Sequence, residues 1–276
     1  MSEVSFWEAS FLWRDPLLAA GLSALLCAFV GVYVVLKRSA FVSAAVSQSA
    51  GLGVVVALLL PHLFDWHPSA LLVGIVAGTL SAGLFGLSRR GGRVGVESAI
   101  ALAYVVAGAA SLLLGTFLTH EYEAVHGILF GDAVAAPPEE LWALGLTTVA
   151  VAALHLAFVR QFLFVSFDPE TAAAMGMKVA RYNVALYFSA GLAISVATRA
   201  VGALPVFALT VIPAAGGLLL SDRLGRVIGF ALATALGATL LGYYFSFIWS
   251  LPTGATIVAT TALALVPGVV RRSLAH

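Results

Sequence analysis

The side chains best suited to chemistry in this sequence are histidines and carboxylates that lie close together in two stretches. The first stretch holds His62, Asp65 and His67, and the second holds His120, Glu121, Glu123 and His126. Imidazole and carboxylate groups are common ligands of transition metals, so both stretches are candidates for metal contact. A charged loop that meets water or a partner protein also explains them.

A second candidate is a short polar segment beginning at Asp168. An aspartate of this kind can cap a helix, Pro169 suits the first helical position, and Glu170 complements the helix dipole. Gly176 is suited to end the helix. The pattern predicts a helix of about two turns, which is either an ordinary capped loop or a docking site for another protein.

The sequence contains no motif that indicates catalysis. There is no Gly-Lys pair, which excludes a P-loop, and no Gly-x-Ser-x-Gly or His-Glu-x-x-His motif. Cys27 is the only cysteine, so no intrachain disulfide can form, and the net charge of +1 gives no indication of nucleic-acid binding. We expect a non-enzymatic protein; if ATP drives its work, the hydrolysis takes place on another chain.

The elements that position these residues are expected to be membrane-spanning helices. Hydrophobic residues make up 61% of the 276 residues and charged residues 10%, against about 45–50% and 25% in soluble domains. Stretches without Lys, Arg, Asp or Glu cover residues 17–36, 39–60, 68–88, 98–119, 141–159, 182–198 and 200–221, and then the 44 residues 227–270. A turn signal at residues 250–254 divides the last stretch into two. The sequence predicts an all-α bundle of eight to nine spanning helices.

Three details of these spans lead to further expectations. Pro205 and Pro213 predict that the seventh span is short or broken and lines a cavity. Gly74 and Gly78 form a Gly-x-x-x-Gly pattern, suited to close packing within the bundle or to a dimer seam. His155 lies within an apolar span, where a neutral ring bonded to a neighbouring helix is favoured over a functional role.

The basic residues divide unevenly between the two sides of this bundle. Of the 14, 12 fall in alternate loops and the C-terminal tail: Lys37, Arg38, Arg89, Arg90, Arg93, Arg160, Lys178, Arg181, Arg223, Arg226, Arg271 and Arg272. The positive-inside rule therefore places this side, with the C-terminus, in the cytoplasm. Residues 1–14, rich in Phe and Trp, are expected to form an interfacial segment, and residues 15–272 a single transmembrane domain.

Six stretches in order resemble one known family. They are 35–41 (Val-Leu-Lys-Arg-Ser-Ala-Phe), 97–100 (Glu-Ser-Ala-Ile), 129–132 (Leu-Phe-Gly-Asp), the segment 167–176 (Phe-Asp-Pro-Glu to Met-Gly), 200–215 (from Ala-Val-Gly-Ala-Leu to Ile-Pro-Ala-Ala) and 251–257 (Leu-Pro-Thr-Gly-Ala-Thr-Ile). In these stretches the chain resembles the permease of the bacterial zinc, manganese and iron ABC importers.

The resemblance implies a permease of the bacterial cytoplasmic membrane that works by alternating access. Two permease copies would pair, each docking one ATPase through residues 168–178, and an extracytoplasmic solute-binding protein would deliver the ion. The coupling residues would be Asp168, Pro169, Glu170, Ala173 and Gly176. This chain would bind no cofactor; ATP and Mg would lie on the ATPase, and the metal ion would be the transported substrate.

The sequence departs from the family at the start of the second span. The family carries an acid and a histidine four residues apart, which places both on one helix face. This chain has Ala44 and Gln48 in their places. Alanine offers no ligand, and the glutamine oxygen is a poor ligand for zinc.

Three hypotheses remain open after this departure. In the first, a metal ion passes a weaker site that includes Ser43, Ser47, Gln48 and Ser49, with Pro213 also on the pathway; the serines could equally be interhelical packing contacts. In the second, the substrate is a metal chelate or another small solute. In the third, the protein is a carrier or scaffold independent of an ATPase, although paired intramembrane charges for ion coupling are missing from the sequence.

Overall fold

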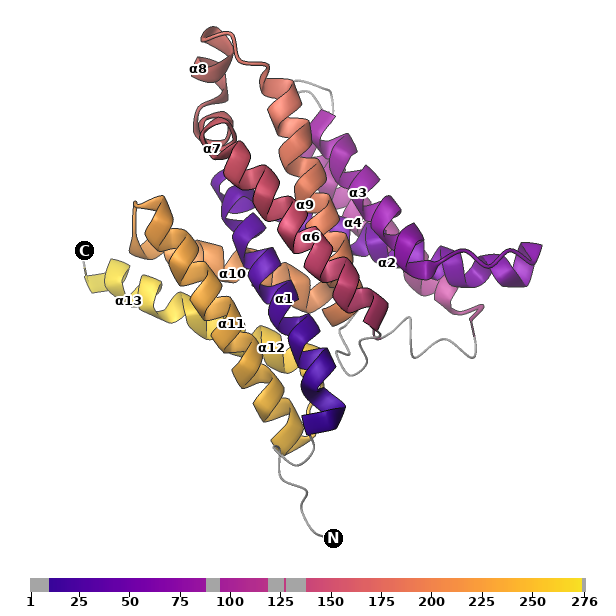
Figure 1. Ribbon diagram of the computed structural model, residues 1–276. Coiled ribbons are helices and arrows are strands. Elements are labelled where there is room, and N and C mark those ends of the chain that lie inside the picture. Colours follow the sequence, from indigo (N-terminus) through magenta and orange to yellow (C-terminus); the bar gives the residue numbers. More distant parts are fainter. Residues whose placement is uncertain (1–9, 88–94, 119–126, 128–137, 275–276) are drawn as a thin grey trace.

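The computed structural model describes residues 10–87, 95–118, 127 and 138–274, and all regular elements in them are helical (Figure 1). They are α1 (Ser10–Leu36), α2 (Phe41–Phe64), α3 (Ala70–Leu87), α4 (Val96–Gly115), α6 (Pro138–Ala157), α7 (Val159–Phe167), α8 (Pro169–Ala174), α9 (Val179–Val201), α10 (Ala203–Leu220), α11 (Leu224–Trp249), α12 (Thr253–Ala262) and α13 (Val266–Leu274). The described residues include nine spans long and apolar enough to cross a membrane. The all-α expectation and the upper count are confirmed.

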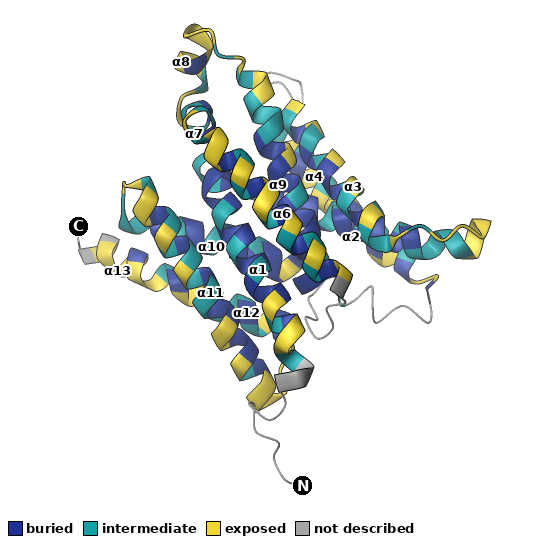
Figure 2. Ribbon diagram, viewed as in Figure 1, coloured by how far each residue is buried: buried dark blue, intermediate teal, exposed yellow. Residues whose placement is uncertain are grey.

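The spans bury small residues inside the bundle and expose large apolar ones outside. In α1, Ala20, Ala24 and Cys27 are fully buried, whereas Leu146 of α6 is 69% exposed. Figure 2 shows the buried residues concentrated on α1, α9 and α10 and the exposed residues on the outward faces. This inversion relative to a soluble protein fits a surface covered by lipid, because large apolar side chains lose nothing by facing hydrocarbon.

Glycines allow the closest helix contacts. A Cβ atom added to Gly31 of α1 would lie 1.8 Å from the carbonyl oxygen of Thr210 on α10. A Cβ on Gly78 of α3 would lie 2.1 Å from Ser195 Oγ on α9, and one on Gly74 would lie 2.7 Å from Val54 of α2. The Gly74–Gly78 pattern therefore packs within the bundle, as expected.

Of the two expectations for the seventh span, the break is wrong, whereas a short span is confirmed, because α10 has only 18 residues. α10 is a continuous helix that follows α9 after the single residue Gly202, whose φ of 88° turns the chain. Pro205 lies in the first turn, where backbone N–H groups have no partner within the helix, so its missing donor costs nothing. Pro213 lies inside α10 without ending it.

The remaining differences lie at helix ends. Residues 10–14 continue into α1, while residues 1–9 of the expected interfacial segment lie outside the described part of the chain. α7 was not predicted; it follows a break at Phe158, where φ is −115° and ψ is 22°. The turn between α11 and α12 is confirmed, with Ser250 in the left-handed region and Ser246 Oγ 2.7 Å from the carbonyl oxygen of Leu251.

Polar contacts bring the basic helix ends together. Lys37, just after α1, donates to Asn183 Oδ1 near the start of α9 at 2.5 Å, and Tyr187 OH lies 3.0 Å from Ser39 Oγ. Arg271 donates to the carbonyl oxygen of Leu220 at the end of α10. Figure 1 shows the end of α1, α8 and the α10–α11 turn toward one side of the bundle, and the α11–α12 turn toward the other.

Candidate functional site

The polar face at the start of α2 is the first candidate. Ser43 and Ser47 are buried, and their hydroxyls donate to the carbonyl oxygens of Ala40 (2.7 Å) and Ser43 (2.8 Å). Ser49 Oγ donates to Ala45 in the same way at 2.8 Å. These three hydroxyls thus donate to α2 and its N-cap residue and not to the neighbouring helices. Each hydroxyl oxygen keeps lone pairs that can face a cation or a water molecule.

Gln48 differs from these serines because its side-chain oxygen is buried without a partner. Its Oε1 accepts no hydrogen bond from any described residue. A Cβ atom on Gly108 of α4 would lie 3.4 Å from this oxygen, so the amide points into the space left by that glycine. A buried carbonyl without a donor is costly, and such an atom in a native fold calls for a ligand, ion or water. The geometry makes Gln48 the strongest polar candidate for ligand contact among the predicted residues at the start of α2.

The position one turn before Gln48 offers no charge to reinforce it. Ala44, one turn earlier on α2, is 6% exposed and has no polar atom. Thr79 of α3 is also buried, and its Oγ1 has no partner among the described residues. Pro213 is buried in the interior of α10.

α8 is the second candidate, and its local structure follows from its sequence. Asp168 Oδ1 accepts a hydrogen bond from the Thr171 N–H at 3.0 Å, and Pro169 occupies the first helical position. At the other end, Gly176 has φ of 82°, the Met177 N–H donates to Ala172 at 3.0 Å, and the Gly176 N–H donates to Ala173 at 3.0 Å. This pair of bonds is a Schellman motif, which defines the end of the helix. The predicted capped helix is confirmed, although it spans only Pro169–Ala174.

Most residues of α8 are exposed in the described part of the chain. Ala172 is fully buried, whereas Glu170, Ala173 and Met175 are exposed, Met175 at 71%. Hydrogen bonds from Thr171 hold the pKa of Asp168 below its ordinary value. The cap therefore stays charged and formed at neutral pH. A rigid, capped helix that exposes an acid and a large apolar side chain at the end of the bundle is suited to contact with another protein.

The stretch around His62 receives no geometric support as a metal site. His62, Asp65 and His67 lie at the end of α2 and beyond it, and all three are exposed. His62 Nδ1 lies 3.2 Å from the carbonyl oxygen of Leu58. In the described part of the chain, no group of three His, Cys, Asp or Glu residues is close enough to hold a metal ion. His120, Glu121, Glu123 and His126 lie outside the described residues, so their assignment stays a prediction.

His155 is a structural residue within the bundle. Its Nε2 lies 3.0 Å from Ser189 Oγ of α9, and the ring packs edge-on against Phe29, Tyr33 and Phe162. The expected hydrogen bond from α6 to a neighbouring helix is confirmed.

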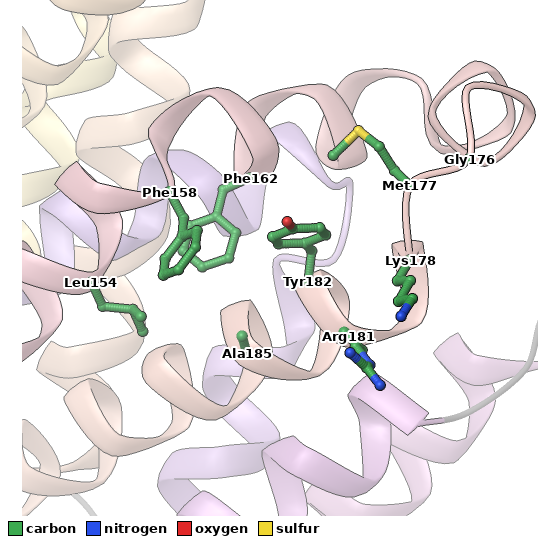
Figure 3. Close-up of a pocket in the computed structure, with 9 residues that line it drawn as sticks. All are labelled: Leu154, Phe158, Phe162, Gly176, Met177, Lys178, Arg181, Tyr182 and Ala185. Carbon is green, nitrogen blue, oxygen red and sulfur yellow. The ribbon is translucent and has the colours of Figure 1, made fainter.

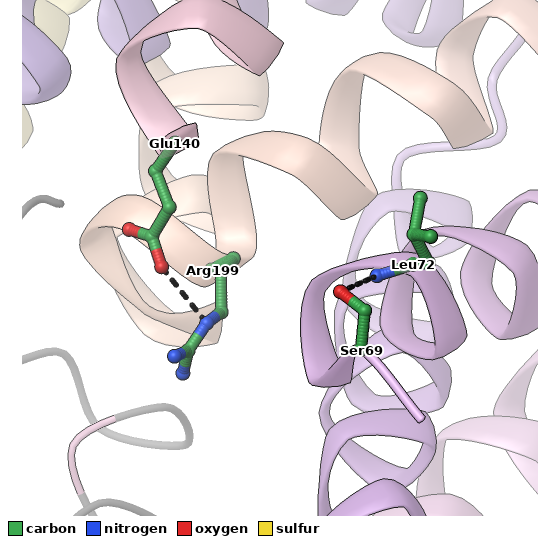
Figure 4. Close-up of polar contacts among 4 residues, drawn as sticks. All are labelled: Ser69, Leu72, Glu140 and Arg199. Atoms are coloured by element: carbon green, nitrogen blue, oxygen red, sulfur yellow. Dashed lines mark hydrogen bonds and ion pairs between the residues drawn. The ribbon is translucent and has the colours of Figure 1, made fainter. Parts of the chain in front are cut away.

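One polar contact was missed by the sequence analysis, an ion pair between α6 and α9 (Figure 4). Arg199 Nε lies 2.9 Å from Glu140 Oε1, and Glu140 is only 5% exposed. Glu140 Oε2 has no partner among the described residues. Figure 4 also shows the start of α3, where Ser69 Oγ accepts the Leu72 N–H at 3.4 Å. The sequence signal was the opposite charge of two residues at the ends of successive spans, but their contact required the tertiary fold.

Comparison with known proteins agrees with this architecture. The chain is 29% identical to the manganese transport system membrane protein MntC of Halalkalibacterium halodurans, over 96% of this chain and 91% of the relative. It is 27% identical to the chelated iron transport system membrane protein YfeC of Yersinia pestis, over 93% and 83%. The fold matches a chain of PsaBC from Streptococcus pneumoniae with a TM-score of 0.81, 23% identity and coverage of 95% and 94%. The profile of the ABC 3 transport family matches residues 10–272. This multi-span membrane protein therefore belongs to the ABC 3 transport family.

Proposed function

We propose that the protein is the membrane-spanning subunit of an ATP-driven importer for a transition metal ion such as manganese, zinc or iron. Support comes from the family membership and from relatives that are manganese and iron transport membrane proteins. The single structural observation that carries the proposal is α8, a capped helix that this chain leaves exposed at one end of a bundle of membrane spans. No part of this chain supplies the energy, so the ATPase is a separate subunit.

In this proposal the exposed face of α8 is the surface on which the ATPase docks. Glu170, Ala173 and Met175 contact the ATPase, while Asp168, Pro169 and Gly176 fix the shape of the helix. Two permease copies each bind one ATPase, and a solute-binding protein delivers the ion at the opposite end. The basic end of the bundle, with α8 and the C-terminus, faces the cytoplasm of a bacterial cell.

The ion passes Gln48 on its way through the bundle. Its buried oxygen, which accepts no bond from the described residues, supplies a neutral ligand, and the oxygens of Ser43 and Ser47 lie on the same helix. Neutral oxygen ligands hold a cation weakly. Weak binding suits a transporter, because the ion must leave the site as readily as it enters.

ATP-driven uptake of manganese and zinc by cells or proteoliposomes tests the proposal. Replacing residues 168–178 by a neutral flexible linker is expected to abolish uptake and co-purification of the ATPase. Asp222→Asn is the control, because Asp222 is an exposed acid in the turn between α10 and α11 at the same end of the bundle. Undiminished uptake after the linker replacement would refute docking through α8, and full uptake without ATP or any partner subunit would point to the independent carrier.

Import of a metal chelate is the second candidate, favoured by Ala44 and Gln48. These residues leave the start of α2 without a charged ligand, and one relative is a chelated iron transport protein. The double variant Ala44→Asp/Gln48→His restores an acid and an imidazole one turn apart. If the substrate is a free ion, this variant should bind zinc more tightly in equilibrium dialysis. Uptake of chelates but not of free ions by the wild type would support the second candidate instead.

A further inference from the structure

Two cavities meet at the start of α9, on the basic end of the bundle. The first, of about 410 Å³, lies between α7 and α9 and is lined by Phe158, Phe162 and Tyr182 together with Lys178 and Arg181. The second, of about 550 Å³, runs along the outer side of α9. Its lining is Leu87, Leu154, Ala180, Arg181, Val184, Ala185 and Phe188. Leu154, Arg181 and Ala185 line both cavities, so the two form one continuous groove.

The two parts of the groove differ in chemistry. The part along α9 is apolar apart from Arg181, and Phe188 at its far end is 49% exposed. From Ala180 to Phe188 the helix rises about 12 Å. The other part carries both basic side chains beside a cluster of three rings (Figure 3), in which Phe158 and Tyr182 have centroids 6.2 Å apart.

No residue in the described part of the chain neutralises the positive charge of this groove. Lys178 and Arg181 are exposed, and neither forms an ion pair with a described residue. None of the described residues that line the two cavities is acidic, and the first turn of α9 contains no acidic residue. Figure 3 shows Arg181 on the first turn of α9 and Lys178 at the residue just before the helix, next to the segment that leads from α8. An anionic group could therefore approach both cations without displacing an internal partner.

We propose that the groove binds an anionic phospholipid. The phosphate lies between Lys178 and Arg181, and the upper part of an acyl chain lies over Ala185 and Phe188. The location supports this ligand, because the cytoplasmic leaflet is negatively charged and attracts basic residues close to the membrane surface. An acidic side chain of a partner protein could meet the two cations, but it would leave the apolar channel along α9 unfilled.

The site adds a regulatory ligand to the proposed function. Gly176 and Met177 line the first cavity, and they lie within three residues of the end of α8. A lipid bound here fixes the segment that joins α8 to α9, so we expect anionic lipid to stabilise the coupling region. This step rests on the proposed function of α8, whereas lipid binding itself rests on the groove and on the cytoplasmic orientation that the positive-inside rule gives.

Binding is tested on the full-length protein in neutral detergent, together with any ATPase that co-purifies. Phosphatidylglycerol, phosphatidylcholine and inorganic phosphate are titrated separately and bound species are counted by native mass spectrometry. Lys178→Gln/Arg181→Gln is expected to weaken phosphatidylglycerol binding about thirtyfold. The matched control Arg223→Gln/Arg226→Gln has the same spacing at the start of α11, where the residues are exposed and line neither cavity; it should bind as the wild type does.

A second variant tests the tail of the ligand. Ala180 is exposed and lines the apolar part, so Ala180→Phe fills the channel without disturbing the core. It should weaken phosphatidylglycerol binding and leave inorganic phosphate binding unchanged.

Three results would overturn the lipid site: equal affinity for phosphatidylcholine and phosphatidylglycerol, inorganic phosphate bound as tightly as the lipid, or displacement of the lipid by the ATPase. The assay requires neither metal nor ATP. Loss of uptake with lipid binding intact would therefore count against the proposed function alone.

Discussion

We expect the substitution Gly31→Ala to force α1 away from α10. The added methyl would lie 1.8 Å from the carbonyl oxygen of Thr210. This oxygen belongs to the backbone and cannot rotate aside, so the two helices must separate by more than about 1 Å, which opens voids along a tightly packed seam. Overpacking costs about 1–3 kcal/mol, and the rigidity of this contact places the expected cost near 3 kcal/mol.

Thermal unfolding of the purified protein in one detergent measures this cost. A loss of about 3 kcal/mol should lower the apparent Tm by roughly 5–10 °C. Gly21→Ala in the same helix is the control, because its new methyl would meet only Leu236 Cδ1 at 3.5 Å, an ordinary contact. If Gly31→Ala unfolds at the same temperature as Gly21→Ala, the close approach of α1 to α10 is not a feature of the folded protein.

Three further predictions concern the two ends of the bundle. Gly176→Ala places a side chain at a φ of 82°, which costs about 1–2 kcal/mol. It should therefore reduce both metal uptake and co-purification of the ATPase. The control Gly225→Ala has open space around its new methyl group and should change neither. Glu140→Gln removes the charge that faces Arg199 and should lower stability by about 1–3 kcal/mol in thermal unfolding, with less than additive loss in Glu140→Gln/Arg199→Gln. Hydrogen bonds from Thr171 keep the pKa of Asp168 below its ordinary value of 3.8, so the cap is lost only as the pH falls through that lowered pKa. Asp168→Asn should therefore remove no step from the pH profile of uptake between about pH 5 and pH 8.

Each of these predictions has a clear contrary result. Wild-type uptake by Gly176→Ala would show that the end of α8 does not need the left-handed residue. Additive losses in the double variant would show that Glu140 and Arg199 act independently. A titration near neutral pH that disappears in Asp168→Asn would show that the carboxylate is not held in its charged form.

The spans and the caps of α8 could be predicted because each depends on local sequence. A membrane span needs only a long apolar run, and Asp168, Pro169 and Gly176 each act within a few residues of their own position. At α10 the two prolines predicted a short or broken span, and only the break was wrong. Proline is harmless in a first turn, and whether Pro213 breaks a helix depends on how neighbouring helices support it.

The pathway residues could be predicted only in part. The sequence identifies Gln48 as a polar residue in a span, but its unpartnered oxygen and the facing Gly108 depend on how α2 packs against α4. The pairing of Glu140 with Arg199 joins residues 59 positions apart, and no local pattern predicts which residue on a distant helix will be adjacent. The basic cluster was interpreted as a topology signal alone, because the groove beside Lys178 exists only in the folded protein.

α9 joins the two ends of the molecule. Its 23 residues extend about 34 Å as a straight rod. The short segment after α8 leads into one end, and Arg199 stands in the last turn at the other. A tilt of about 5° about the α8 end would carry that last turn roughly 3 Å sideways, which is enough to part the guanidinium from Glu140. A small displacement of α8 would thus produce a larger displacement of Arg199 at the opposite end of α9.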